Sequence, residues 1–387
     1  MSNTVNPKPN KKAPIESVPT KGAKRKMTPT ARVVLIVLLC LVAILPLVFL
    51  VVKDMIVNYY LGKINIVTEE EDLVFQTERL SDEEIPDITE EIYHNGELNA
   101  EQLPLICDNK NVTNILLLAT DNRTSEAGRT DSMILVSVNQ ETNKIVLCSF
   151  LRDIWAKYPK EPASPVAGDY DKLNHAHAYG GPALTMAVLK ETFNIDVKYY
   201  AKVDFIAFRD MIDTMGGLDM YLTGDEVYAM NDILSWPDDA NAVLGTTASD
   251  LLQNKGDGVY HLNGKQALAH ARNRTIGYDW ARTERQRNVL QAMADKAKTL
   301  SLSQLDDLLT TVLPMITTNM PKNEIKKFVD KAPFYLAYDR ESTRVPLAGT
   351  YSEVNYNIIP DLPANCNDLY EKIYGKAPDA DTNSDNQ

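Results

Sequence analysis

Short apolar runs alternate with segments in which apolar residues recur every three or four positions between about residues 111 and 300. The apolar runs, each bounded by polar turn residues, predict strands near 114–119, 131–138, 144–150, 198–203 and 218–222. The helical spacing predicts helices near 182–193, 204–214, 263–271 and 280–300. Alternation of strands and helices is typical of an α/β fold, so we expect a three-layer α/β/α sandwich with a central mixed sheet.

The longest apolar run is Val33–Val52, which is long enough to cross the roughly 30 Å hydrocarbon core of a bilayer as a helix. It predicts a single transmembrane helix that precedes the folded domain. The basic residues before it outnumber the acidic ones eight to one, and such an excess holds that side of the helix in the cytoplasm. We therefore expect a cytoplasmic amino terminus and an extracellular domain. A cleaved signal peptide fits less well, because no small-residue cleavage site follows the run.

The pattern divides the chain into six segments. They are a disordered basic tail (1–32), the transmembrane helix (33–52), a membrane-proximal stalk (53–108), the main α/β domain (109–302), a helical and irregular extension (303–375) and a disordered tail (376–387). Beyond residue 32 the chain carries 52 acidic and 32 basic residues, a net charge of −20. A domain this acidic has no basic stripe for a polyanion, which argues against nucleic-acid binding.

Arginine and aspartate gather in four clusters inside the main domain. They are Asp121-Asn122-Arg123, Arg129-Thr130-Asp131, Arg152-Asp153, and the run from Gln266 through Arg272-Asn273-Arg274 to Asp279, Arg282 and Arg285-Gln286-Arg287. The planar guanidinium group matches phosphate oxygens, and carboxylate oxygens are the ligands that Mg²⁺ prefers. Ordinary surface ion pairs would explain one such cluster, but not several in order along the chain. The clusters predict a site for metal-bridged pyrophosphate and phosphoryl transfer.

Residues from about 111 to 300 resemble the catalytic domain of the LytR-CpsA-Psr family. The matching stretches are Leu118–Arg123, Arg129–Leu135, Ser149–Asp153, Lys172–Ala176, Gly180-Gly181, Met215–Asp219, Leu262–Leu268, Arg272–Arg274, Asp279, Arg282 and Arg285-Gln286. No single stretch is decisive, but their order and spacing are specific. The chain departs from the family pattern at Thr120, Leu151 and His270-Ala271, and none of these departures removes a charged group.

The resemblance implies a membrane-anchored phosphotransferase. Its donor would be a glycopolymer joined through pyrophosphate to a polyprenyl lipid, its acceptor peptidoglycan, and its product a phosphodiester. The residues expected to bind pyrophosphate are Arg123, Arg129, Arg152, Arg272, Arg274, Arg282, Arg285 and Gln286. Asp121 and Asp131 are expected to hold Mg²⁺, and both are expected to act in catalysis together with Arg152. Asp153 is expected to orient Arg152 through an ion pair.

Arg272 and Arg274 would point to different faces of a regular helix, so we expect them at a helix end or in a turn. Arg282 and Arg285 lie three residues apart and are expected to share one face near the start of their helix, where the helix dipole favours phosphate. The lipid requires an apolar cavity. Residues in the helical stretches around 184–189, 205–212 and 289–290 are candidates for lining it, although such stripes most often form ordinary core.

Three other functions remain open from the sequence. A zinc hydrolase could use His175, His177, His261 and His270, although their spacing is not a standard helical zinc pattern. A metal-dependent hydrolase of polyprenyl pyrophosphates would use the same charged residues with water as the acceptor. A membrane-bound transcriptional attenuator is disfavoured, because the predicted topology places the domain on the side without DNA. Cys107 and Cys366 could form a disulfide, but spacing alone does not show that they meet.

Overall fold

The structure is a computed structural model that describes residues 53–67, 78–80, 103–106, 110–120, 128–162, 164–237 and 239–378; for Asp131 it describes the backbone alone. The chain divides into two units, Met1–Ile56 and Val57–Gln387, and the second is described below. The expected tails, the transmembrane helix at 33–52 and most of the stalk lie outside the described residues. Within those residues, no helix combines the length and apolar character needed to cross a membrane.

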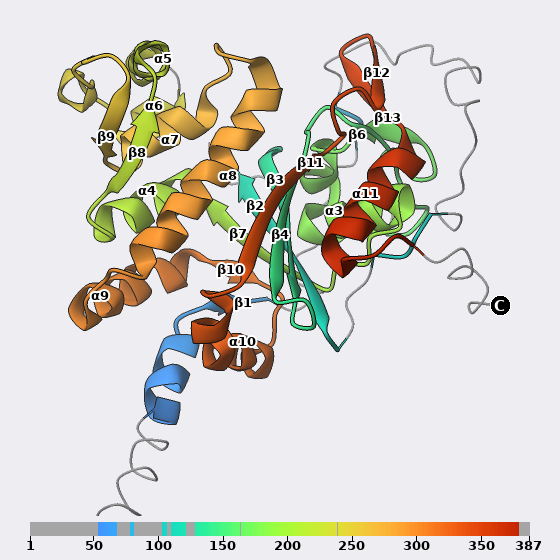
Figure 1. Cartoon of the computed structure of the whole chain (residues 1–387). Coiled ribbons are helices and arrows are strands. Elements are labelled where there is room, and N and C mark those ends of the chain that lie inside the picture. The colour runs from blue at the N-terminus through green and yellow to red at the C-terminus, as the bar shows by residue number, and fades with distance from the viewer. Residues whose placement is uncertain are drawn as a thin grey trace, which may run out of the picture. The chain divides into compact units, whose positions relative to one another are not determined.

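A mixed sheet lies at the centre of the described part of the chain (Figure 1), with strand order β1-β10-β7-β2-β3-β4-β11. Its strands are β1 (Asn65–Ile66), β2 (Val112–Thr120), β3 (Thr130–Asn139), β4 (Lys144–Phe150), β7 (Tyr199–Asp204), β10 (Thr317–Thr318) and β11 (Asp339–Val345). The β2–β3 and β3–β4 pairs are antiparallel, whereas β7 and β11 join β2 and β4 in parallel. The predicted central mixed sheet is therefore confirmed.

Helices cover both faces of the sheet, with α3 and α11 on one face and α4, α7 and α8 on the other (Figure 1). The helices are α3 (His175–Phe193), α4 (Phe205–Thr214), α5 (Gly224–Ser235), α6 (Asp239–Leu244), α7 (Gly264–Arg272), α8 (Tyr278–Ala297), α9 (Leu302–Val312), α10 (Lys322–Tyr335) and α11 (Leu362–Tyr374). Three small two-stranded sheets flank this core: β5 (Trp155–Lys157) with β6 (Tyr170–Lys172), β8 (Leu218–Leu222) with β9 (Gly258–Leu262), and β12 (Tyr351–Val354) with β13 (Asn357–Pro360).

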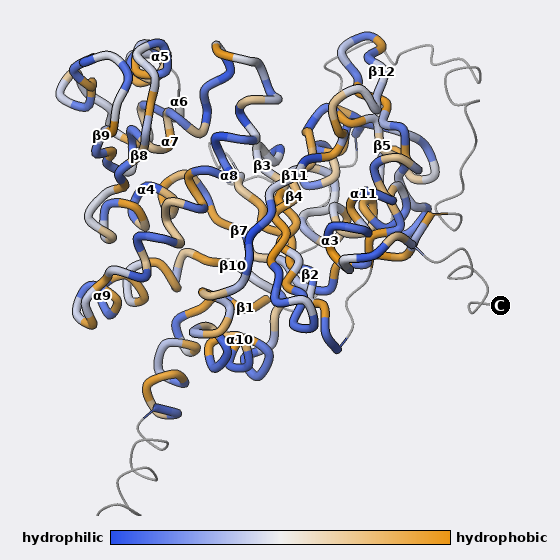
Figure 2. Tube along the Cα trace, viewed as in Figure 1, coloured by the Kyte–Doolittle hydropathy of each residue, from blue (hydrophilic) through white to orange (hydrophobic). Residues whose placement is uncertain are grey.

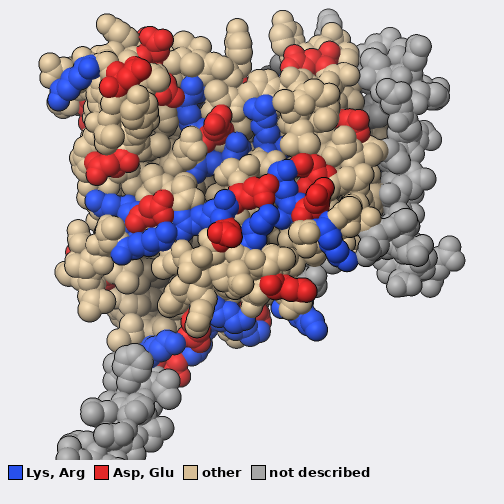
Figure 3. All heavy atoms as spheres, in the orientation of Figure 1, with Lys and Arg blue, Asp and Glu red and all other residues tan. Residues whose placement is uncertain are grey.

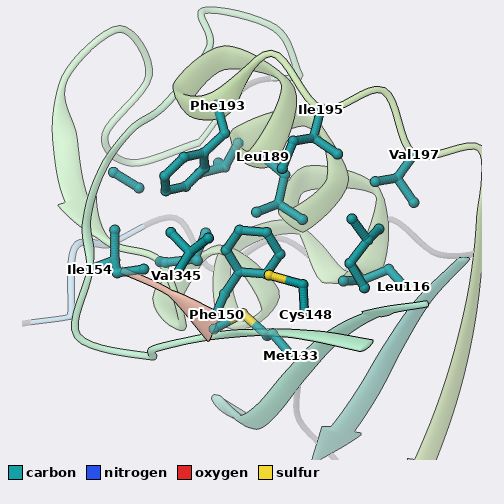
Figure 4. Packing of buried hydrophobic residues seen from close by; sticks show 14 of the residues in the cluster. Leu116, Met133, Cys148, Phe150, Ile154, Leu189, Phe193, Ile195, Val197 and Val345 are labelled. Carbon is teal, nitrogen blue, oxygen red and sulfur yellow. The ribbon is translucent and has the colours of Figure 1, made fainter. Parts of the chain in front are cut away.

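The two faces of the sheet differ in how tightly they are packed. Along β2, successive residues alternate between buried and half-buried, as the two-residue period of a strand requires. Leu116 and Leu118 are buried in one core cluster with residues of α3 and α11. Figure 4 shows Leu116 in this cluster with Cys148, Phe150 and Leu189. Figure 2 shows hydrophobic colour along the central strands. The other face, on which Leu117 lies, is less completely filled.

The carboxyl-terminal part of the chain is more closely integrated than its sequence pattern indicated. Residues 303–375 were expected to form a helical and irregular extension, yet they supply β10 and β11 to the main sheet and α11 to its covering layer. Six of the seven residues of β11 are polar, so this strand has little hydrophobic signal in the sequence. Conversely, the predicted strand at 218–222 exists as β8 but pairs with β9 outside the main sheet.

Cys366 carries a free thiol that is 2% exposed and donates to the backbone oxygen of Phe193 at 3.4 Å. The disulfide with Cys107 that the sequence left open is therefore not formed, and Cys107 itself lies outside the described residues. Burial raises the pKa of the Cys148 thiol to about 12, as expected for a small apolar core residue.

The difference between the two faces predicts unequal costs for neighbouring truncations in β2. Leu116→Ala should lower the free energy of unfolding by about 2–5 kcal/mol, because it opens a void in the closed core. Leu117→Ala should cost clearly less, because its side chain lies on the half-buried face. Urea unfolding of both variants measures the difference, and equal losses would contradict the assignment of the faces.

Candidate functional site

A cavity of about 510 Å³ lies between the less tightly packed face of the sheet and helices α4, α7 and α8. It is lined by Leu117, Leu118, Ala119, Ser132, Ile134, Arg152, Ala201, Val203, Asp204, Phe205, Phe208, Met211, Trp236, Leu268, Ala271, Arg272, Arg274, Arg282, Gln286, Leu290, Met293 and Ile316. Most of these side chains are apolar, and the polar exceptions are Ser132, Asp204, Gln286 and the four arginines. The lining is therefore suited to a molecule that is apolar over most of its length and anionic at one part.

Small side chains at the middle of the sheet leave room for the cavity. Ala119 of β2 lies opposite Ser132 of β3, and Leu117 lies opposite Ala201 of β7. Residues two apart on a strand share a face, so these positions form one shallow floor beneath the helices. Larger residues there would fill the space as they do on the opposite face.

The cavity runs across the strands. Arg152 follows the end of β4, and Ile316 directly precedes β10, which is separated from β4 by β3, β2 and β7. Four strand spacings of about 4.8 Å correspond to roughly 19 Å between these limits. The length is suited to an extended chain, and the arginine-bearing end is distinct from the end at Ile316.

The carboxylate of Asp279 forms ion pairs with three arginines from separate segments of the chain. Arg152 Nε donates to Asp279 Oδ2 at 3.3 Å, while Nε of Arg274 and Nε of Arg282 lie 3.1 and 3.2 Å from Oδ1. Asp279 is in the first turn of α8, where a carboxylate also complements the helix dipole. Burial would raise the pKa of Asp279, but Arg282, Arg152 and Arg274 outweigh it and hold the pKa below its usual value. The carboxylate thus stays ionised and fixes the three guanidinium groups.

Further contacts position Arg152 and Arg272. Arg152 Nε also donates to Asp153 Oδ2 at 3.2 Å, so the expected ion pair within this dipeptide is present. Lys172 Nζ lies 3.6 Å from the other oxygen of Asp153. Arg272 ends α7, donates to Asn241 Oδ1 at 3.3 Å and stacks over the ring of Phe205. Arg274 follows in the loop, which agrees with the expected position of this pair at a helix end.

The structure places Arg285 outside the cavity, which corrects the prediction that it shares a face with Arg282. Its Nε donates to Glu226 Oε1 at 3.1 Å, and its other nitrogens donate to the backbone oxygens of Asn273 (3.0 Å) and Ile276 (2.8 Å). Three residues on a helix differ by about 60° in direction, and here that difference separates the side chain of Arg285 from the cavity that Arg282 lines. Arg285 therefore holds the loop that carries Arg274.

The remaining predicted residues are placed only in part. Asp121 and Arg123 lie outside the described residues, and Arg129 is exposed and does not line the cavity. The backbone of Asp131 is described. Thr120, the last residue of β2, pairs with Thr130 of β3, so Asp131 lies at this end of the sheet, where β4 ends beside Met133.

The four histidines considered as zinc ligands do not form a cluster in the structure. His175 Nδ1 contacts Asp171 Oδ1, His177 Nδ1 contacts the backbone oxygen of Gly128, and His261 Nδ1 contacts Asp219 Oδ1. Burial lowers the pKa of His177 and that of His270 to about 4. Among the described residues, no group of three or more His, Cys, Asp or Glu side chains could hold a metal ion. The zinc-site interpretation therefore has no support from the four histidines.

Several features of the site had no sequence signal. The small residues Ala119, Ser132 and Ala201 give the cavity its depth, yet nothing in their local sequence distinguishes them from ordinary strand residues. Trp236 lines the wall from the loop after α5, whereas Phe205, Phe208, Met211 and Leu290, which also line it, were among the candidates from the helical stretches. Asp279 lies in one of the four arginine and aspartate clusters of the sequence. Its role as the common partner of three arginines was not predicted, because it depends on how those arginines converge in space.

Fold and site together define a mixed α/β protein with an apolar cavity rimmed by arginine. The model of the LytR_cpsA_psr family matches residues 75–366, and the chain belongs to this family. The polyisoprenyl-teichoic acid–peptidoglycan teichoic acid transferase TagU of Bacillus cereus is 31% identical over 214 residues, which are 54% of this chain and 61% of that protein. TagT of Bacillus subtilis is 29% identical over 245 residues, 62% of this chain and 69% of that protein. The match to TagU thus spans about three fifths of its length.

Solved structures show the same fold. The crystal structure of B. subtilis TagT has a TM-score of 0.51 and 24% identity, over 72% of this chain and 98% of that chain. TagT bound to LI-WTA has a TM-score of 0.52 and 25% identity over the same shares. Protein gbs0355 from Streptococcus agalactiae has a TM-score of 0.54 and 23% identity, over 69% of this chain and 89% of that chain.

The Asp279 contacts predict a pH-dependent loss of stability in Asp279→Asn. Because the folded protein lowers this pKa, the carboxylate stabilises the fold above the unfolded value of about 3.9, and the contribution is lost as pH falls through the lower folded-state pKa. The variant should be less stable by about 1.5–3 kcal/mol at pH 7, and the gap should narrow below about pH 4. Urea unfolding at both pH values, with the exposed Asp232→Asn as control, measures it. A gap independent of pH would contradict this role.

Proposed function

We propose that this protein is a membrane-anchored phosphotransferase that moves a glycopolymer from a polyprenyl-pyrophosphate-linked donor onto peptidoglycan and forms a phosphodiester. The observation that carries the proposal is the joining of an apolar cavity and an arginine rim in one site. A polyprenyl chain is apolar along its length and anionic at its pyrophosphate, which matches the two parts of that lining. The names of the relatives TagU and TagT, both teichoic acid transferases, support the choice of donor and acceptor.

The charges of the rim favour binding of a pyrophosphate. Arg152, Arg272, Arg274, Arg282 and Lys172 contribute five positive charges on or beside the rim, and Asp153, Asp204 and Asp279 contribute three negative charges, which leaves a net charge of +2. The phosphates of the donor would meet fixed N–H donors instead of water, and such prearranged electrostatic stabilisation is usually the largest catalytic contribution. A solved structure of TagT bound to LI-WTA, 25% identical to this chain, supports the binding of such a ligand by this fold.

In this proposal the transfer joins an acceptor hydroxyl oxygen to the phosphorus atom that carries the glycan. The bond from that phosphorus to the bridging oxygen breaks, and polyprenyl phosphate leaves with the electron pair. The arginines neutralise the charge that develops on the bridging oxygen, and Asp279 keeps them in place while the apolar wall excludes water. The described residues do not single out a base for the hydroxyl proton.

Asp121 and Asp131 are the proposed ligands of Mg²⁺. The backbone of Asp131 lies at the sheet end near Arg152, Asp121 follows Thr120 in the sequence, and each residue offers the hard oxygen atoms that Mg²⁺ prefers. A bound Mg²⁺ would withdraw charge from the phosphate oxygens. Because Mg²⁺ usually keeps several waters and takes one or two protein carboxylates, this pair would be sufficient.

Arg152→Ala should lower the rate of transfer about tenfold or more, since one hydrogen bond to a charged group contributes about 1.5–3 kcal/mol. The fold should persist, because Asp279 keeps Arg274 and Arg282. Transfer of labelled glycan from a polyprenyl pyrophosphate donor to peptidoglycan measures the rate. Release of free glycan phosphate instead would favour the hydrolase alternative.

The matched control is Arg285→Ala, which removes an arginine of the same helix that does not line the cavity. It should lower the free energy of unfolding, because it leaves Glu226 and two backbone oxygens without their donor. Arg152→Ala should lower the free energy of unfolding less than Arg285→Ala does. An unchanged transfer rate in Arg152→Ala would assign it a structural role.

Changes at the proposed metal ligands should not be additive. Asp121→Ala and Asp131→Ala should each lower the rate of Mg²⁺-dependent transfer. The double variant should lose little more activity than the more impaired single variant, because the two residues act as one unit. High Mg²⁺ should partly restore each single variant, and Zn²⁺ should not replace it. Full activity in chelator, or strictly additive losses, would refute the shared site.

A further inference from the structure

Two tyrosines adopt a backbone conformation that tyrosine rarely takes. The described residues other than glycine that have a positive φ are Asn143, Asn194, Tyr278, Asn355 and Tyr356. Asparagine enters this left-handed region readily, but a bulky side chain there strains the backbone. The φ of Tyr278 is 53° and that of Tyr356 is 61°. We call these two residues the tyrosine pair, and the surrounding structure holds both of them in a strained conformation.

Packing does not explain the tyrosine pair. Tyr278 is 78% exposed and Tyr356 85%, so neither ring belongs to the core. Asn355 and Tyr356 form the two-residue turn between β12 and β13, and glycine is the usual residue at the second position of such a turn. Glycine would remove the strain without the loss of a buried contact. Strained residues are concentrated at functional sites, so we looked for a contact that these rings could make outside the fold.

The tyrosine pair lies beside the arginine rim. Tyr278 directly precedes Asp279, the common partner of the three arginines. Ile358, two residues after Tyr356, donates its backbone N–H to the backbone oxygen of Asp153 at 2.9 Å. Two residues of extended chain span at most about 7 Å, so the backbone of Tyr356 lies near Asp153. Both tyrosines are thus attached next to residues that hold the arginines.

An aromatic stack joins the two segments that carry the tyrosine pair. The ring of Trp280, in the first turn of α8, lies 4.6 Å from the ring of Tyr351 in β12. Arg344 of β11 lies over the ring of Trp280 at 4.6 Å. Figure 1 shows the start of α8 and the β12–β13 hairpin at the same, upper end of the molecule. The stack therefore fixes the hairpin relative to the helix and to the arginine rim.

We propose that the tyrosine pair binds sugar rings of the acceptor glycan, an inference that rests on the proposed transfer reaction. In that reaction an acceptor hydroxyl reaches phosphorus at the arginine rim, while the lipid occupies the apolar part of the cavity. The acceptor therefore approaches at the arginine end, where the tyrosine pair is exposed. A pyranose ring has an apolar C–H face that lies flat on an aromatic ring, and its hydroxyl groups can pair with the phenol O–H.

The charges near the tyrosine pair favour an uncharged glycan over an anionic polymer. Glu353 is the single charged residue of the hairpin 351–360, so the hairpin carries one negative charge. Among the described residues on the face in Figure 3, basic and acidic side chains are interleaved and form no broad basic surface. A polyanion would meet repulsion at the hairpin, whereas the sugar rings of an uncharged glycan would not.

The test measures binding of a tetramer of β-1,4-linked N-acetylglucosamine to the full chain in detergent micelles, by saturation-transfer NMR with empty micelles as background. The variants are Tyr278→Gly and Tyr356→Gly, because glycine accepts a positive φ without strain. The matched control is Tyr228→Ala, since Tyr228 is 69% exposed on α5 and lies outside both segments. A tetramer of glycerol phosphate is the anionic probe.

The parent chain should bind the sugar tetramer, and each glycine variant should bind it about fivefold more weakly, the loss expected for one aromatic stacking contact. Tyr228→Ala should bind as the parent does. The melting temperature of Tyr356→Gly should equal or exceed that of the parent, because strain is removed and no core contact is lost. A parent chain that does not bind the sugar, equal affinities in all variants, tighter binding of the anionic probe, or a lower melting temperature of Tyr356→Gly would overturn the proposal.

Transfer assays separate this inference from the proposed function. Both glycine variants should raise the KM for the peptidoglycan acceptor about fivefold and leave the affinity for polyprenyl pyrophosphate unchanged. Transfer by the parent with an unchanged acceptor KM in both variants would refute the role of the tyrosine pair and leave the transferase standing. Sugar binding that depends on the tyrosine pair in a protein that transfers nothing would support the sugar site and refute the transferase.

Discussion

The site depends on one carboxylate that holds three positive charges within reach of one another. Arg152 comes from the end of β4, Arg274 from the loop after α7 and Arg282 from α8, and each lies 3.1 to 3.3 Å from an oxygen of Asp279. Without this shared partner the guanidinium groups would repel one another in a half-buried setting, where charge interactions are stronger than in water. Asp279 therefore keeps the three guanidinium groups together without a bound anion.

Helix α8 connects this rim to the rest of the domain. One side of the helix faces the cavity through Arg282, Gln286 and Leu290, and Arg285 lies beside that face, where its hydrogen bonds hold the loop before α8. Glu226, the partner of Arg285, also closes the capping box at the start of α5. The position of Arg274 thus depends on an ion pair that never contacts the cavity, and the two arginines of one helix perform different tasks.

Much of the fold and of the candidate site was predicted from the local pattern of apolar and charged residues in the sequence. Apolar runs marked β2, β3 and β4, and the order of the arginine clusters indicated an anion site at the strand ends and the family to which the chain belongs. The features that escaped prediction depend on residues far apart in sequence. The direction of Arg285 is decided by Glu226, and the place of β11 in the sheet by its pairing with β4. The depth of the cavity results from small side chains on three neighbouring strands.

The central claim is that one cavity binds both the lipid and its pyrophosphate. A crystal structure of the protein with a polyprenyl pyrophosphate would test this most directly. Our account predicts the prenyl chain along Leu117, Ile134 and Ala201, with phosphate oxygens within hydrogen-bond distance of Arg152, Arg274 and Arg282. A lipid found at another surface, or phosphates turned away from these arginines with the chain in the cavity, would contradict it.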